Sequence, residues 1–121
     1  MKNNPLWIPA SEYVKDSSIN KFISNINKSY SLNLQNYNDL YNWSIENIDK
    51  FWKEISNFNN IIYSKKYSEV LNFSNIFDAK WFVNSKLNYA ENLLIRRDYQ
   101  TAIYFFGEDL IKYNISYSEL Y

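Results

Sequence analysis

The stretch Trp81–Leu94, WFVNSKLNYAENLL, decides how this chain is organised. Two large aromatic residues come before the turn pair Asn84-Ser85, and a short helix is predicted to follow the turn. Asn88 is a good N-cap, because its side-chain oxygen can accept hydrogen bonds from the free amides of the first helical turn. Glu91, three residues later, is placed where a carboxylate can reach back to the cap amide. The stretch therefore predicts a corner that joins an extended segment to a helix near residues 88–96.

Other side chains of this stretch have expected roles. Trp81 is predicted to be a packing anchor, because it has apolar neighbours and precedes a capped helix. Arg96 and Arg97 would fall in the last helical turn, where cations interact favourably with the helix dipole. Asn88 and Glu91 could instead contact a ligand, but helix capping is the preferred interpretation.

Apolar periodicity upstream predicts amphipathic helices within residues 18–56, with a break near Glu46-Asn47. Apolar stripes of this kind usually pack against neighbouring elements, so they indicate a core and not the lining of a small-molecule site. The clearest stripe consists of Ile19, Phe22, Ile23 and Ile26. The expected helix starts are Ser18, Asn36 or Asn38, and Asn47.

The segments on either side of these helices have weaker patterns. Residues 1–17 are expected to be irregular, with Pro5 and Pro9 flanking an extended apolar plug that docks on a larger body. Farther along, the sequence predicts a short strand, a solvated basic loop and an extended or irregular segment. The apolar plug is Leu6-Trp7-Ile8. The short strand is Ile61-Ile62-Tyr63, the basic loop is Lys65-Lys66-Tyr67, and the extended or irregular segment is residues 68–80.

The last part of the sequence predicts a β-hairpin over about residues 101–116. Thr101–Phe106 is strongly β-prone and does not alternate, so both of its faces are expected to be covered. Gly107-Glu108-Asp109 is typical of a hairpin turn. Ser116–Glu119 has the capping-box form, and the sequence stops at Tyr121. We expect that so short a helix cannot form, because nucleation costs more than one turn returns, and that the sequence is the front end of something longer.

Composition excludes several classes of site. The 121 residues include no histidine and no cysteine, which excludes Ser-His triads, thiolate nucleophiles, disulfides and His-metal or zinc-ribbon sites. The single glycine excludes both the Walker loop and the dinucleotide fingerprint. A formal net charge of zero predicts no broad attraction to nucleic acid or to anionic membranes. With no signal-peptide pattern and no run of roughly 20 apolar residues, a cytoplasmic protein is expected.

These patterns together predict an α+β fold, with N-terminal amphipathic helices followed by a β-hairpin. The high aromatic content, 20%, fits either a module that buries rings against a partner or the codon bias of an AT-rich genome. No catalytic, cofactor-binding or metal-ligating residue is predicted anywhere in the chain.

Three stretches carry a resemblance to a known family: LWIP at 6–9, SLNLQNYNDLYNWSIENIDKFWKEI at 31–55, and WFVNSKLNYAENLL at 81–94. They resemble the N-terminal region of acetoacetate–CoA ligases, in the adenylate-forming superfamily, and TAIYFFGEDLIKYNISYSEL is similar to the point where that family enters its adenylation domain. The resemblance implies an acetyl-CoA-synthetase-type module over residues 1–100 and an incomplete AMP-dependent ligase domain at 101–121. Val83–Lys86 departs from the family, which tends to have Pro-Gly there.

The resemblance also implies a reaction, the ATP-dependent conversion of acetoacetate and CoA into acetoacetyl-CoA, AMP and diphosphate. ATP, Mg and CoA are implied for the full-length enzyme and no cofactor for this chain, because the phosphate loop, ribose contact and catalytic lysine belong to later segments. The chain is therefore expected to be inactive alone, to self-associate, and to have the downstream adenylation domain as its partner. The alternatives are a stand-alone interaction module and a piece of a related acetate or short-chain acyl–CoA ligase.

Overall fold

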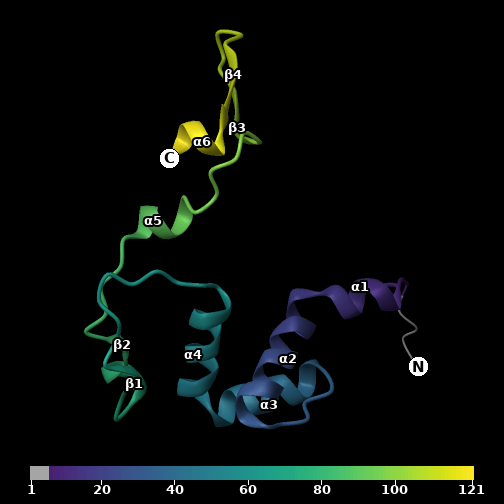
Figure 1. The fold of residues 1–121 in the computed structure, drawn as a ribbon, viewed down its shortest axis with the longest axis vertical. Helices are drawn as coiled ribbons and strands as arrows, with labels where there is room; N and C mark the ends of the chain where they lie inside the picture. The colour runs from purple at the N-terminus through teal and green to yellow at the C-terminus, as the bar shows by residue number, and fades with distance from the viewer. Residues whose placement is uncertain (1–5) are drawn as a thin grey trace. The chain divides into compact units, whose positions relative to one another are not determined.

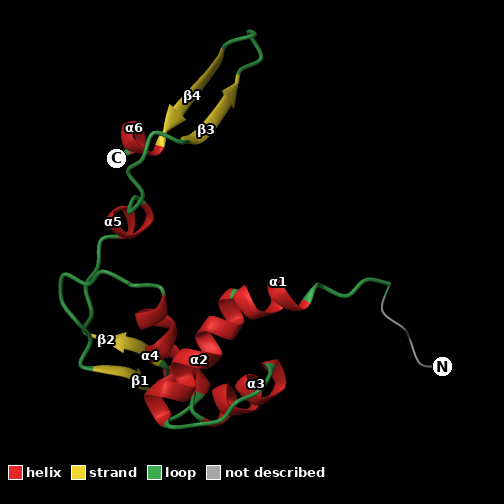
Figure 2. Cartoon of the chain, turned by 45° about the vertical axis from the view of Figure 1, so that its right-hand side comes forward, coloured by secondary structure: helices red, strands yellow, loops and turns green. Residues whose placement is uncertain are grey.

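The structure, a computed structural model, describes residues 6–121 apart from the side chain of Ile76, so Pro5 lies outside the described residues. The chain divides into two units, the first ending at Asn60 and the second beginning at Ile61. The first is helical, and the second holds strands β1 to β4 together with short helices (Figures 1 and 2). The predicted α+β fold is confirmed. Among the described residues, no helix has the length and apolar character needed to cross a bilayer.

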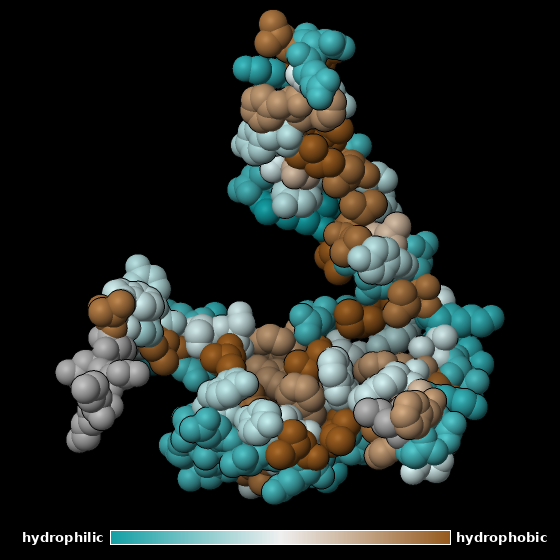
Figure 3. Space-filling view, turned by 180° about the vertical axis from the view of Figure 1, so that it is seen from behind, coloured by the Kyte–Doolittle hydropathy of each residue, from teal (hydrophilic) through white to brown (hydrophobic). Residues whose placement is uncertain are grey.

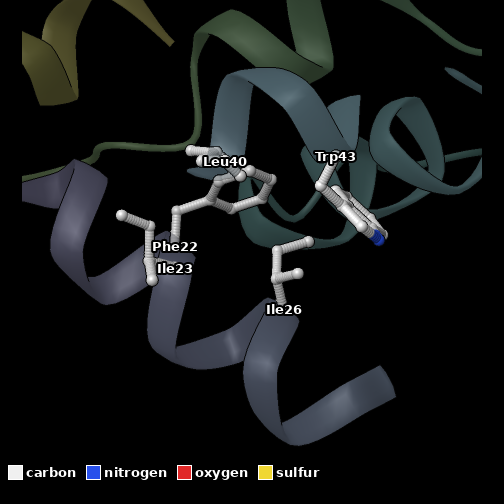
Figure 4. Packing of buried hydrophobic residues seen from close by; sticks show 5 residues of the cluster. All are labelled: Phe22, Ile23, Ile26, Leu40 and Trp43. Atoms are coloured by element: carbon white, nitrogen blue, oxygen red, sulfur yellow. The ribbon is translucent and has the colours of Figure 1, made fainter. Parts of the chain in front are cut away.

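Four helices form the first unit, and the predicted helices within residues 18–56 are confirmed. They are α1 (Ser11–Asp16), α2 (Ser18–Tyr30), α3 (Tyr37–Glu46) and α4 (Ile48–Phe58). Residues of α2 and α3 point toward one another and form a small core (Figure 4). The buried members are Phe22, Ile23, Ile26, Leu40 and Trp43, so the apolar stripe of α2 is core, as predicted, although Ile19 at its start is exposed.

Helix α4 covers this core with its own apolar stripe. Phe51, Ile55 and Phe58 are partly buried against the cluster. The ring of Phe22 makes edge-on contacts with the rings of Phe51 and Phe58, at centroid distances of 5.9 and 5.2 Å. Such edge-to-face geometry is favourable beyond the area it buries.

The helix starts differ in detail from those predicted. Ser17, one residue before the predicted cap, is the N-cap of α2, and its hydroxyl accepts a hydrogen bond from the Asn20 amide. Asn36 caps α3, as predicted. Asn47 does separate α3 from α4, but its side chain makes no cap bond: it donates to the Trp43 carbonyl and accepts from Lys50.

The prediction that residues 1–17 are irregular is wrong for Ser11–Asp16, which form α1. This helix buries none of its residues, so it has no apolar stripe that could have revealed it. A glutamate in its first turn and a lysine in its last favour it through the helix dipole. Ser17 also closes α1, because its amide donates to the Val14 carbonyl.

The second unit has two small antiparallel sheets. Strands β1 (Glu69–Asn72) and β2 (Lys80–Val83) pair with each other, with the short 3-10 helix η1 (Ile76–Asp78) between them. The remaining elements are α5 (Tyr89–Leu93), β3 (Thr101–Phe106), β4 (Lys112–Ser116) and α6 (Tyr117–Leu120). Pairing of β3 with β4 confirms the predicted hairpin.

Two predictions for residues 61–80 need correction. Residues 61–63 form no strand, because an asparagine side chain 30 residues away occupies the backbone groups of Ile62. Residues 69–72, predicted only as extended or irregular, pair with β2 because the return of the chain through η1 brings the two segments together. The turn at Asn84-Ser85 is confirmed, with Asn84 in the left-handed region at φ 61° and the Ser85 amide donating to Phe82.

Helix α6 forms, contrary to prediction. The Ser116–Glu119 capping box is complete, and two amides of this turn donate to Asp98 and Gln100 carbonyls ahead of β3. These contacts from outside the helix offset the nucleation cost that an isolated turn could not recover.

Candidate functional site

Each unit of the described residues has an open hollow, and neither of these two hollows forms a reaction centre. Residues 6–121 hold no group of three or more acidic, histidine or cysteine side chains that could bind a metal ion. One hollow lies at the β1–β2 turn and is lined by Asn72, Phe73, Ser74, Phe77, Asp78, Ala79 and Lys80. The other lies between α2 and α4 and is lined by Asn25, Lys28, Ser29, Glu54, Asn57 and Phe58. Neither brings a nucleophile together with a base, so the site of interest is the corner and the surfaces that it presents.

The corner is held by two asparagines of the WFVNSKLNYAENLL stretch. Asn88 caps α5, as predicted, by accepting from the Glu91 amide. Asn92 contacts a loop 30 residues away: its side-chain oxygen accepts from the Ile62 amide at 2.8 Å, and its nitrogen donates to the Ile62 carbonyl at 3.0 Å. A side-chain amide thus acts as a neighbouring strand would. The role of Asn92 cannot be predicted from the sequence, because an asparagine inside a short helix has no local pattern that indicates a distant partner.

Removing this contact should free the loop. We expect Asn92→Ala to expose the Ile62 amide and to increase its hydrogen exchange by roughly tenfold or more, because about 1 kcal/mol is lost for each hydrogen bond. The measurement is residue-resolved amide exchange. Glu91→Gln on the same helix is the control and should leave Ile62 protected. Equal exchange at Ile62 in both variants would show that Asn92 does not hold the loop.

An aromatic cluster lies beneath the corner. Tyr63 and Tyr67 each contact the Phe82 ring, at centroid distances of 6.4 and 5.3 Å. Trp81, its neighbour on β2, is 45% exposed in this chain. The anchoring role of Trp81 stays a prediction for a longer form of the protein, in which the exposed part of the ring could be covered.

The arginines lie beyond α5, not in its last turn as predicted, because the helix ends at Leu93. Arg96 donates from Nε to Asp98 at 2.5 Å and stacks 4.4 Å from the centroid of the Tyr117 ring. The hydrogen bond from Arg96, together with one from the Gln100 amide, holds the pKa of Asp98 below its ordinary value. Arg97 stacks on the Tyr121 ring at 3.5 Å. Both arginines thus fix the segment before β3 against α6.

The capping box of α6 gives a pH-dependent contact. Glu119 accepts from the Ser116 amide at 2.9 Å and from its hydroxyl at 2.7 Å, which lowers the pKa of Glu119. Because the folded-state pKa is lowered, these bonds stabilise α6 above the ordinary carboxyl pKa. Their contribution is lost as the pH falls through the lowered value.

We expect Ser116→Ala to raise the pKa of Glu119 partway to its ordinary value, because one of its two donors is removed. The Ser118→Ala variant is the control and should leave the pKa lowered. An NMR titration of the Glu119 carboxyl carbon measures both variants. Identical titration curves in the two variants would contradict the capping contact.

The hairpin presents an exposed apolar surface. The face seen in Figure 3 shows hydrophobic residues, in brown, along this part of the chain. Exposed side chains occur on both strands and in the turn: Ile103, Tyr104, Phe105, Phe106, Leu110, Ile111 and Tyr113. Scattered apolar residues are normal on a surface, but a contiguous group marks a place where another surface packs.

Comparison with known proteins points to one family. The family described as acetyl-coenzyme A synthetase N-terminus matches residues 37–93. An acetoacetyl-CoA synthetase of Danio rerio is 39% identical over 100 residues, which are 81% of this chain and 15% of the relative. One of Xenopus tropicalis is 42% identical over the same shares. The structure of acetoacetyl-CoA synthetase from Streptomyces lividans matches 97% of this chain with a TM-score of 0.84 and 27% identity.

This chain belongs to the acetoacetyl-CoA synthetase family. The family assignment expected from the LWIP, 31–55 and 81–94 stretches is confirmed. The chain spans about 15% of the length of the Danio rerio and Xenopus tropicalis synthetases and 19% of the Streptomyces lividans chain. What the rest of those synthetases does is therefore considered next as a proposal for this one.

Proposed function

We propose that this chain is the N-terminal module of an acetoacetate–CoA ligase. The complete enzyme would convert acetoacetate, ATP and CoA into acetoacetyl-CoA, AMP and diphosphate. Residues 1–100 would form the acetyl-CoA-synthetase-type module, and residues 101–121 would begin the AMP-dependent ligase domain. The observation that carries the proposal is the structural match over 97% of this chain to 19% of an acetoacetyl-CoA synthetase.

The described residues fit neither a glycine-rich ATP phosphate loop nor a Mg site. A phosphate loop needs several glycines, and the one glycine here, Gly107, closes the β3–β4 hairpin by donating to the Ile111 carbonyl. Residues 6–121 also lack a cluster of acidic side chains that could hold a divalent ion. No step of the reaction is therefore assigned to this chain, and in this proposal the groups that bind ATP, Mg and CoA belong to other segments of the ligase.

In this proposal the chain provides apolar surfaces on which the adenylation segment docks. The helical unit forms its own core around Ile26, and the corner fixes the course of the chain into β3. The exposed Trp81 ring and the hairpin then supply apolar faces for the adenylation segment to cover. Burial of such faces is the main favourable term in the docking of two modules.

Activity of a joined form tests the proposal. We define the joined form as this chain continued by the remaining segment of the Danio rerio acetoacetyl-CoA synthetase. The joined form should release diphosphate in the presence of acetoacetate, ATP and CoA, whereas the purified 121-residue chain should stay at the level of a buffer control. Acetoacetate-dependent release by the chain alone would contradict the proposed division of labour. An inactive joined form that is nevertheless folded would contradict the module assignment.

A further inference from the structure

We propose that Lys65 and Lys86 together bind the dianion of a phosphate monoester. The two lysines belong to segments that are far apart in the sequence, and the backbone holds them opposite each other. The phosphate group would lie between the two ammonium groups and accept hydrogen bonds from both. The site depends on backbone contacts within this chain, so it does not rest on the proposed function.

The backbone fixes Lys65 directly opposite Lys86. The two residues form an antiparallel bridge, in which the Lys65 amide donates to the Lys86 carbonyl at 3.1 Å and the Lys86 amide donates back at 2.9 Å. The Ser64 hydroxyl also donates to the Lys86 carbonyl, at 3.1 Å. Residues that exchange both backbone bonds have their side chains on the same face. The two lysine side chains therefore extend side by side from one short stretch of ladder.

This arrangement of charges is unfavourable without an anion. Like charges at directly opposed positions destabilise a strand pair. Both side chains are exposed, and within the described part of the chain neither Lys65 nor Lys86 forms an ion pair. Lys66 differs from them, because its ammonium group lies 5.7 Å from the centroid of the Tyr67 ring. A bound anion between Lys65 and Lys86 would offset their repulsion.

The charge of the pair indicates the class of ligand. Two ammonium groups balance a dianion, whereas a single carboxylate or chloride ion would leave one positive charge uncompensated. A phosphate monoester carries a charge of about −1.5 to −2 at neutral pH and has three strong acceptor oxygens. Each lysine ammonium supplies three donors and binds phosphate as a compact point charge. The pair therefore fits a phosphate monoester in both charge and hydrogen bonding.

A titration with glycerol phosphate tests the pair. The amide chemical shifts of Lys65 and Lys86 in the 121-residue chain give the dissociation constant. Lys65→Gln should raise this constant by roughly fivefold to tenfold, because one of the two charges is lost. Lys66→Gln is the matched control, because it removes the same charge one residue away, and should change the constant by less than about twofold. Equal effects of the two substitutions, or no binding by the unaltered chain, would overturn the proposal.

The charge of the ligand provides a second readout. The second pKa of a phosphate monoester is about 6, so the dianion predominates at about pH 7.5 and the monoanion at about pH 5. The chain contains no histidine, the side chain that ordinarily titrates in this interval. Binding should therefore be at least about threefold tighter at the higher pH. Equal affinity at both values, or equal shifts with chloride at the same ionic strength, would show general screening and overturn the proposal.

The joined form, without ATP or CoA, shows whether the pair keeps this role in a longer protein. With glycerol phosphate at about ten times its dissociation constant, the Lys86 amide should exchange roughly tenfold more slowly, because the ligand stabilises the closed ladder. The Lys65→Gln variant of the joined form should show no such slowing. Slowing in the free chain but not in the joined form would overturn the proposal, since another segment would then occupy the pair.

Discussion

Replacing Trp43 with alanine is expected to lower the free energy of unfolding of the helical unit by about 3–5 kcal/mol, as for other large aromatic truncations in cores. Trp43 is only 9% exposed, and its ring contacts the tilted Tyr30 ring at a centroid distance of 5.3 Å. Among the described residues this core has five buried apolar members, so few neighbouring side chains can move to fill the cavity.

Chemical denaturation followed by the helical circular dichroism signal measures this effect without depending on tryptophan fluorescence. Trp7→Ala is the matched control, because Trp7 is 76% exposed and should contribute almost nothing to stability. Equal stabilities of the two variants would mean that the core around Ile26 is not what holds this unit together.

Trp81→Ala is expected to have a much larger effect in the joined form than in the free chain. The ring is 45% exposed here, so its truncation should cost about 1 kcal/mol in the free chain. Covering the ring would raise the cost to about 3–5 kcal/mol. Calorimetric unfolding of both forms, each with and without the substitution, gives the comparison. An unchanged unfolding temperature in the joined form, with only a loss of acetoacetate affinity, would place Trp81 in a binding site instead.

Periodic and capped segments could be predicted from the sequence. The stripe from Phe22 to Ile26 identified α2 because its spacing matches one helix face. Asn36 and Asn88 identified the starts of α3 and α5 through their capping chemistry. Gly107 and the β-prone run before it identified the hairpin. In each case the signal lies within a few residues of the element that it specifies.

Elements that depend on distant contacts could not be predicted. The sequence at Ile61-Ile62-Tyr63 predicts a strand, because nothing near it shows that Asn92 satisfies the backbone of Ile62. The one-turn helix α6 depends on carbonyls at Asp98 and Gln100, so a local nucleation argument excluded it wrongly. The helix dipole argument places Arg96 in the last turn of a helix, whereas α5 ends at Leu93 and Arg96 pairs with Asp98 instead.

For the functional site, too, one part could be predicted from the sequence and another part could not. Missing residue types excluded histidine, cysteine and glycine-loop chemistry without any structure. The surfaces that remain exposed could not be located in advance, because a β-prone run such as Thr101–Phe106 looks the same in sequence whether it is covered or open. Only the structure separates the buried Trp43 from the half-exposed Trp81.

The most direct test of the module assignment is amide exchange across residues 101–116 in the free chain and in the joined form. Both are measured at a dilution where light scattering detects a single copy. We predict weak protection of the outward-facing amides of β3 in the free chain and at least roughly tenfold stronger protection in the joined form, because the adenylation segment covers the hairpin. Strong protection through Ile115 in the free monomer, unchanged on joining, would contradict the account and favour a stand-alone module.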